Sequence, residues 1–343
     1  MSSLFFPAWY HYTHMSDNGA IIHVREITKR FGDVEAVKGI TFDVEKGELF
    51  GFLGPNGAGK TTTINILCTL LKPTSGTAVL NGFDVTAKPN DVRRSIGLVF
   101  QDPSLDDRLT AWENLQFHAL VYGVPTEERL GRIENVLKMV ELYERRNDAV
   151  KTFSGGMKRR LEIARGLLHY PKVLFLDEPT LGLDPQTRSH IWEYIHELKK
   201  REGTTVFLTT HYMDEAENCG RIAIIDHGKI VALDTPDNLK DKVGGDVITV
   251  KTDDDGAAKR LIEERYKLEA AVDPHGVSFK VKGGEEFIPS FVKDFERKIL
   301  SISLRRPTLE DVFLSLTGRA IRDEESGAKD QMRVAAKAWT RRR

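Results

Sequence analysis

The segment Gly54-Pro55-Asn56-Gly57-Ala58-Gly59-Lys60-Thr61 decides the fold, because it joins a glycine-rich turn to a lysine and a threonine at fixed spacing. It follows a strand predicted over residues 48–53 and opens a helix predicted over residues 60–71. Strand, glycine-rich loop and helix in this order form the context that a phosphate-binding P-loop requires. Backbone N–H groups at a helix start attract phosphate oxygens. A merely flexible glycine-rich loop is the alternative.

Two motifs together predict a nucleoside triphosphate site. Lys60 is predicted to reach the β and γ phosphates, and the Thr61 hydroxyl to ligate Mg²⁺. An apolar run at residues 173–176 ends in Asp177 and Glu178, and Asp177 is predicted to hold the Mg²⁺ shell. Adjacent side chains at a strand end point in different directions, so Glu178 is free to act as a general base toward water. A solvated turn is the structural alternative for these carboxylates.

A third motif, Ser154-Gly155-Gly156, begins a helix predicted over residues 155–169. A serine hydroxyl and two glycine amides at a helix N-terminus make a second predicted phosphate site, although alone they could be only a cap and a turn. The block Thr152-Phe153-Ser154-Gly155-Gly156-Met157 resembles the signature of the ABC ATPases, usually Leu-Ser-Gly-Gly-Gln. Phe153 and Met157 depart from that pattern.

This resemblance covers residues 20–235 and implies sites that two subunits share, because in the family the signature closes on ATP held by the other subunit. It implies that Gln101 completes the Mg²⁺ shell, that Asp184 touches the opposite subunit and that His211 contacts the γ-phosphate. Phe31 is expected to stack on adenine. The structural alternatives are a loop amide, a helix-initiating aspartate, a strand-end histidine and a core phenylalanine, respectively.

The predicted cofactors are ATP and Mg²⁺, and the predicted site residues fall into three groups. The catalytic residues are Lys60, Gln101, Glu178 and His211. The metal ligands are Thr61, Gln101 and Asp177. The nucleotide contacts are Phe31, Gly54, Pro55, Asn56, Gly57, Ala58, Gly59, Lys60, Thr61, Thr62, Ser154, Gly155, Gly156 and Asp184.

A resemblance near the end of the chain narrows the family. Residues 305–318 are similar to the closing segment of the daunorubicin-resistance type of exporter ATPase. The resemblance implies export of drugs or other hydrophobic or amphipathic compounds. The same residues also fit a capped helix with Thr308 as its N-cap and one apolar face, and both interpretations can hold.

The fold class is predicted to be α/β: a P-loop NTPase with a RecA-like parallel core, an antiparallel β layer and a helical insert, plus a small C-terminal α/β domain. Residues 1–19 are expected to be a disordered N-terminal extension and residues 20–235 the ATPase domain, with the insert at about 102–166. Residues 236–318 are expected to form an assembly or regulatory domain. Residues 319–343 are expected to be a disordered polar tail.

Composition limits the partners. Among 343 residues, 50 basic and 51 acidic side chains leave no net field to recruit nucleic acid. No apolar run is long enough to cross a bilayer. The two cysteines, Cys68 and Cys219, lack the spacing of a metal site or a disulfide framework. The expected partners are a separate membrane permease and a second copy of this chain, and the expected location is cytoplasmic, on the inner face of the membrane through the permease.

Two rival functions belong to other classes. The first is a non-transport ABC ATPase that acts mechanically on DNA or ribosomes; the single cassette and the lack of sustained heptads oppose it. The second is a regulatory subunit that binds ATP without hydrolysing it. The presence of Lys60, Glu178 and His211 opposes this one.

Overall fold

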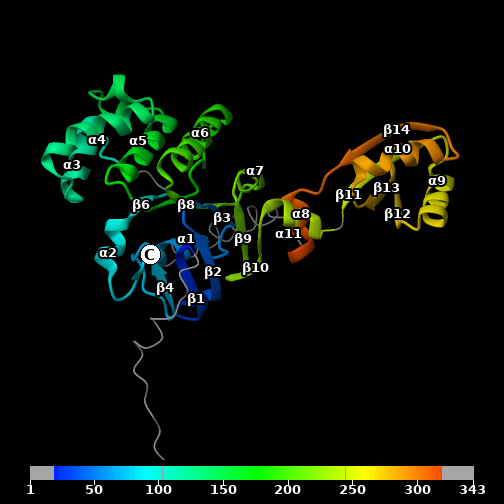
Figure 1. Cartoon of the computed structure of the whole chain (residues 1–343), viewed down its shortest axis with the longest axis horizontal. Helices are drawn as coiled ribbons and strands as arrows, with labels where there is room; N and C mark the ends of the chain where they lie inside the picture. Colours follow the sequence, from blue (N-terminus) through cyan, green and yellow to red (C-terminus); the bar gives the residue numbers. More distant parts are fainter. Residues whose placement is uncertain (1–18, 102–103, 244, 319–343) are drawn as a thin grey trace, which may run out of the picture. The chain divides into compact units, whose positions relative to one another are not determined.

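The computed structural model describes residues 19–101, 104–243 and 245–318 (Figure 1). Residues 1–18 of the predicted extension and the predicted tail at residues 319–343 lie outside these ranges. The described residues fall into two compact units: one holds residues up to 48, 62–176 and 180–207, and the other holds residues 49–61, 177–179 and those from 208 onward. In the described ranges, no helix is long and apolar enough to span a membrane.

The first unit contains the predicted antiparallel layer, with strand order β2-β1-β4-β5. The strands are β1 (Ala20–Phe31), β2 (Val34–Glu45), β4 (Ser75–Leu80) and β5 (Phe83–Asp84). Ile22 of β1 lies opposite Val44 of β2 and Leu80 of β4, and all three side chains are buried. Alternation along the strands therefore turns one apolar face inward.

The helical insert also belongs to the first unit, where α3 (Ala111–Val121), α4 (Thr126–Met139) and α5 (Gly155–Leu167) lie together (Figure 1). Thr110 and Glu113 form a capping box that starts α3. The shorter helix α2 (Pro89–Ser95) precedes β6. The helical insert predicted as part of the fold class is confirmed.

The central sheet has six strands in the order β10-β9-β3-β8-β7-β6. Its strands are β3 (Leu49–Leu53), β6 (Ile96–Val99), β7 (Val173–Asp177), β8 (Thr205–Thr210), β9 (Arg221–Asp226) and β10 (Lys229–Asp234). The parallel pairs β6–β7 and β3–β9 confirm the predicted parallel core. Every residue of β3, β7 and β8 is buried, as expected for strands covered on both faces. Helix α6 (Pro185–Glu202) connects β7 to β8.

The second unit contains a four-stranded antiparallel sheet in the order β12-β13-β11-β14. Its elements are α7 (Met213–Ala216), α8 (Pro236–Lys242), β11 (Asp246–Thr252), α9 (Asp255–Leu261), a π-helical turn (Ile262–Tyr266), β12 (Ala270–Asp273), β13 (Gly276–Val281), α10 (Gly284–Asp294), β14 (Ile299–Arg305) and α11 (Leu309–Thr317). The aromatic rings of Phe279, Phe291 and Phe295 form much of the core beneath this sheet.

One predicted helix boundary is wrong. The helix α1 spans Lys60–Leu67 and does not reach residue 71, because Thr69 adopts a left-handed φ of 64°. Helix α10 begins at Gly284, where the backbone N–H donates to Asp246 Oδ2 at 2.7 Å. Strand β12 was not predicted, since it is only four residues long.

Candidate functional site

The glycine-rich loop leaves the buried strand β3 and enters α1, as predicted. A Cβ atom on Gly54 would lie 2.3 Å from the carbonyl oxygen of Ile225, so no larger residue fits there. Gly57 and Gly59 have φ values of 83° and 106°, which glycine adopts without steric cost. The loop is also tied to the turn after β9, because Gly228 N–H donates to Ala58 O at 3.0 Å.

Lys60 is 4% exposed and is the first residue of α1. Its Nζ donates to Gly54 O at 2.7 Å and to Pro55 O at 3.1 Å, and it lies 3.2 Å from Glu178 Oε1. Burial lowers the pKa of Lys60, while the charge of Glu178 and a hydrogen bond to it act in the opposite direction. The ammonium group of Lys60 therefore has three acceptor oxygens within 3.2 Å.

Asp177 and Thr61 lie together, with Thr61 Oγ1 3.4 Å from Asp177 Oδ1. Thr209 Oγ1 also donates to Asp177 Oδ1, at 2.5 Å. Burial raises the pKa of Asp177, and these two hydroxyls oppose the shift. A hydroxyl and a carboxylate are the oxygen donors that Mg²⁺ takes from a protein when phosphates supply other ligands. Among the described residues, no group of three or more His, Cys, Asp or Glu could hold a metal by itself.

Glu178 lies between Lys60 and His211. Its Oε1 is 3.3 Å from His211 Nδ1 as well as 3.2 Å from Lys60 Nζ. Burial alone would raise the pKa of Glu178, but the His211 hydrogen bond and the Lys60 charge bring it below its usual value. The side chain is therefore ionised at neutral pH and can accept a proton. Its backbone has φ 48°, and its N–H donates to Thr209 O at 3.2 Å.

In the first unit, Ser154 is the N-cap of α5, and its Oγ accepts from Met157 N–H at 3.2 Å. A Cβ on Gly156 would lie 2.4 Å from Thr187 Cγ2, so the start of α5 needs a glycine to approach α6. Asp184 caps α6 by accepting from Thr187 N–H at 3.0 Å and from Thr187 Oγ1 at 2.7 Å. Thr187 thus connects the signature motif with the predicted Asp184 site.

The other predicted residues of this unit are Phe31, Gln101 and Thr62. Phe31 is 47% exposed at the end of β1, with Lys29 Nζ 5.0 Å from its ring centroid, so it is not a core phenylalanine. Gln101 is exposed and lies two residues after the end of β6 at Val99. The second unit brings together Lys60, Thr61, Asp177, Glu178 and His211.

Sequence reasoning missed Thr209, which contacts both carboxylate residues of the site. It also missed the neighbouring pair in which Thr210 Oγ1 donates to buried Glu215 Oε2 at 2.6 Å. The only signal was the run Thr209-Thr210-His211 at the end of an apolar strand. Hydroxyls at that place could equally have faced solvent.

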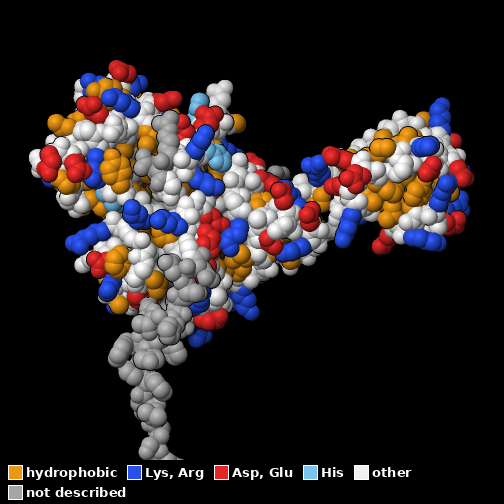
Figure 2. Space-filling view, viewed as in Figure 1, with side chains coloured by type: hydrophobic (Ala, Val, Ile, Leu, Met, Phe, Trp, Pro, Cys, Tyr) orange, Lys and Arg blue, Asp and Glu red, His pale blue; other side chains and the backbone are white. Residues whose placement is uncertain are grey.

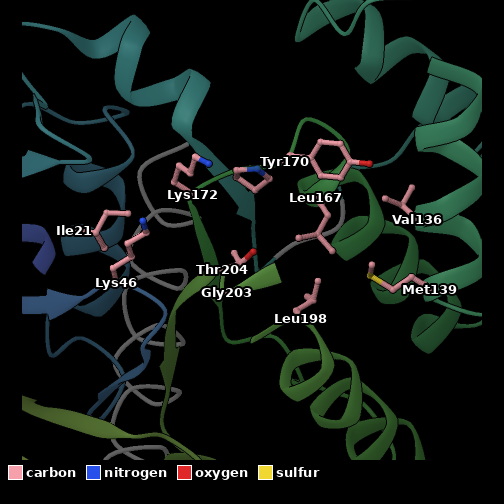
Figure 3. A pocket seen from close by; sticks show the side chains of 11 residues that line it. Ile21, Lys46, Val136, Met139, Leu167, Tyr170, Lys172, Leu198, Gly203 and Thr204 are labelled. Carbon is pink, nitrogen blue, oxygen red and sulfur yellow. The ribbon is translucent and has the colours of Figure 1, made fainter. Parts of the chain in front are cut away.

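A separate cavity of about 240 Å³ lies in the first unit (Figure 3). Lys46 and Lys172 lie toward one side of it, and Val136, Leu167 and Leu198 lie toward the other. None of the predicted site residues lines this cavity, so it is not the nucleotide site.

The buried parallel strands, the phosphate-binding loop and the acidic pair at the end of β7 define a P-loop ATPase. The family model described as ABC transporter matches residues 37–181. The linearmycin resistance ATP-binding protein LnrL of Bacillus subtilis (strain 168) is 39% identical over 88% of this chain and 100% of its own length. The daunorubicin/doxorubicin resistance ATP-binding protein DrrA of Streptomyces peucetius is 37% identical over 92% of this chain and 98% of its own length.

Solved structures agree with these relatives. A dimeric ATP-binding cassette in a post-hydrolysis state with ADP and Pi is 30% identical, with a TM-score of 0.58 over 62% of this chain and 98% of that one. The cbiO1 subunit of a cbiONQ ABC transporter from Clostridium perfringens is 29% identical, with a TM-score of 0.61 over 73% of this chain and 96% of that one. The chain belongs to the ABC transporter ATP-binding proteins, of the daunorubicin-resistance type, and is an ATPase.

Proposed function

We propose that this chain is one half of a homodimer that hydrolyses ATP to drive a separate membrane permease, which exports hydrophobic or amphipathic compounds. The observation that carries the proposal is the ionised Glu178 between Lys60 and His211. The names of the relatives, which refer to resistance to linearmycin, daunorubicin and doxorubicin, support export of compounds of that kind. Through the permease, the chain would lie on the cytoplasmic face of the membrane.

In the proposed mechanism, Lys60 exchanges Glu178 and loop carbonyls for the β and γ phosphate oxygens of ATP. That exchange frees Glu178 to accept a proton from the attacking water, while His211 holds its carboxylate from the other side. Thr61 and Asp177 would hold Mg²⁺, which supplies charge neutralisation. Gln101 would join this shell, and Phe31 would stack on the base.

The homodimer follows from the second phosphate motif. Ser154 and Gly155 lie at the start of α5, and the nearest atom to a Cβ on Gly155 would be 3.9 Å away. The bare helix start is suited to receive a γ-phosphate from a second copy, with Asp184 beside it on α6. Two such contacts, related by a two-fold axis, close the pair.

A groove in the first unit is suited to receive the permease. It has a volume of about 650 Å³ and is lined by Leu70, Phe100 and Val121, which are 49%, 37% and 64% exposed, together with Arg93 and Arg94. We propose that a short cytoplasmic helix of the permease, apolar on one side and acidic on the other, binds here.

On the face drawn in Figure 2, basic and acidic side chains are interspersed, which offers no continuous basic surface for nucleic acid.

The proposed division of labour places ATP chemistry in residues 20–235, with the helical insert at about 102–166, and assembly or regulation in residues 236–318. The C-terminal sheet has an aromatic core of its own. Deleting the chain from Asp237 onward should leave ATP binding close to the full-length value while weakening pairing or coupling to the permease. Complete loss of nucleotide binding in a folded truncation would contradict this division.

Glu178→Gln tests the homodimer. Glutamine keeps the shape and a carbonyl acceptor but cannot take a proton, so turnover should fall by about 10²–10⁴. Binding residues remain, and removing a negative charge beside the γ-phosphate favours the closed pair. Size-exclusion chromatography with light scattering should show a stable dimer with MgATP and a monomer with ADP. Tight ATP binding with one assembly state in both nucleotides would refute the shared site.

A further inference from the structure

Helix α5 buries three charged side chains on one side, beyond the signature at its start. Arg159 and Arg165 are 6% and 8% exposed, and Glu162 has no exposed surface. The spacing of three residues brings them onto one face of the helix. This face packs closely on β6, because a Cβ on Gly97 would lie 2.2 Å from the carbonyl oxygen of Gly166. The charged cluster is therefore next to the strand that leads to Gln101.

The cluster binds the chain on both sides of Gln101. Glu162 Oε1 accepts from the backbone N–H of Ser104 at 2.8 Å. Arg165 donates to Ser104 O at 2.8 Å and to Ser104 Oγ at 2.6 Å. Arg159 donates to the carbonyl oxygen of Phe100. Phe100 and Ser104, which flank Gln101, are thus both fastened to one helix.

Glu162 makes this arrangement possible, because it is the negative charge between two buried cations. Its Oε2 lies 3.1 Å from Arg159 Nη1, and its Oε1 lies 3.9 Å from Arg165 Nη2. Arginine stays protonated when buried, so both guanidinium groups need acceptors. Glu162 and the carbonyl oxygens of Phe100 and Ser104 supply most of these acceptors in one fixed geometry, while Arg165 Nε has none among the described residues.

We infer that Glu162 is a positioning residue that makes α5, Phe100 and Gln101 move as one body. The signature at the start of α5 and Gln101, the predicted Mg²⁺ ligand, would then change position together when two subunits close. Phe100 and Arg165 also line the proposed permease groove, so the charged cluster of α5 connects that groove to the signature and to Gln101. The inference rests on the proposed function of Gln101 and the signature.

The test compares Glu162→Gln, Gln101→Ala and the double variant in the full-length chain, with kcat from phosphate release and Kd from a fluorescent ATP analogue. Glu162→Gln should lower kcat by about 10- to 100-fold, as a displacement of about 1 Å can do, and leave Kd nearly unchanged. The double variant should be no slower than Gln101→Ala alone. Glu162→Asp keeps the charge and should recover part of the activity.

Glu141→Gln is the matched control, because it removes an ion pair to Arg160 of the same helix that does not touch the segment. It should keep wild-type kcat. If Gln101→Ala is impaired and the double variant lowers kcat by the product of the two single effects, Glu162 has only a structural role. The inference is then wrong, although the proposed function stands. If Gln101→Ala turns over normally, the proposed role of Gln101 fails, and the inference fails with it.

Arg165→Lys replaces Glu162→Gln in this test if the Glu162→Gln variant does not fold. It keeps the positive charge beside Glu162 but shortens the reach to Ser104. The same double-variant comparison with Gln101→Ala then decides between positioning and structure.

Discussion

The molecule buries two ion clusters that differ in how firmly their members are held. In the phosphate-loop cluster, Glu178 is shared by Lys60 and His211, and its backbone has the left-handed φ of 48°. In the α5 cluster, Glu162 lies between two arginines that also bind backbone carbonyls. Buried charge therefore has two uses in one chain: exchangeable partners suit chemistry, and fixed partners suit positioning.

The cations of the two clusters show the same contrast. Lysine can lose its proton, and burial already lowers the pKa of Lys60. Arginine stays charged in proteins, so Arg159 and Arg165 depend on their acceptors permanently. The phosphate-loop cluster also carries backbone strain at Glu178, since a non-glycine residue in the left-handed region costs on the order of 1 kcal/mol or more.

Lys60→Ala should have the largest effect. Losing the ammonium over the β and γ phosphates removes transition-state charge stabilisation, so turnover should fall by about 10³-fold or more. Steady-state phosphate release measures it. Lys172→Ala, which changes an exposed lysine outside the predicted site, is the matched control and should turn over normally. Near-wild-type turnover of Lys60→Ala would mean that the phosphate-loop cluster does not carry out ATP hydrolysis.

Stability should separate the two glutamates. Glu162→Gln leaves two permanent buried cations short of a counter-charge and should destabilise the chain by about 3 kcal/mol. Glu178→Gln should cost about 1 kcal/mol or less, because Lys60 keeps two carbonyl acceptors and can shed its proton. Thermal unfolding of the two variants under identical conditions checks this order. Equal losses of unfolding free energy would mean that the two clusters hold their charged groups equally firmly.

The sequence predicted the phosphate-loop cluster because its motifs are short and local. Lys60 and Thr61 follow glycines at fixed spacing, and Asp177 and Glu178 end an apolar strand. The resemblance added His211. Local spacing also predicted the buried parallel strands and the helices of the insert, since apolar periodicity reports which face is buried.

The α5 cluster could not be predicted in this way. Glu162 contacts Ser104, 58 residues earlier, and a glutamate between arginines on a helix usually indicates an exposed face. Thr209 was missed for the same reason, because its contact with Asp177 spans 32 residues. Long-range polar contacts leave no period in the sequence. The early end of α1 depended on one left-handed residue, Thr69.

The smallest expected effect concerns a histidine near the α5 cluster. His118 has its pKa lowered to about 3, first by burial and then by the positive charges of Arg165 and His169. Its ring centroid lies 4.6 Å from that of Tyr122, which in turn stacks on His169 at 4.0 Å. The pKa of His169 is also lowered by burial. Protonation of His118 would thus place a further cation beside a permanently charged arginine.

The sign follows from the depressed pKa. The unfolded chain takes up the proton below about pH 6.5, whereas the folded chain resists until about pH 3, so stability is full above 6.5 and is lost as pH falls toward 3. At pH 5.5 the loss is about 1 kcal/mol. His118→Gln removes this titration, so its melting temperature should fall less than that of the wild type between pH 7.5 and 5.5. His190→Gln, at an exposed histidine of α6, should keep the wild-type dependence. If His118→Gln also keeps it, neither burial nor the charge of Arg165 depresses the pKa of His118 in the folded chain.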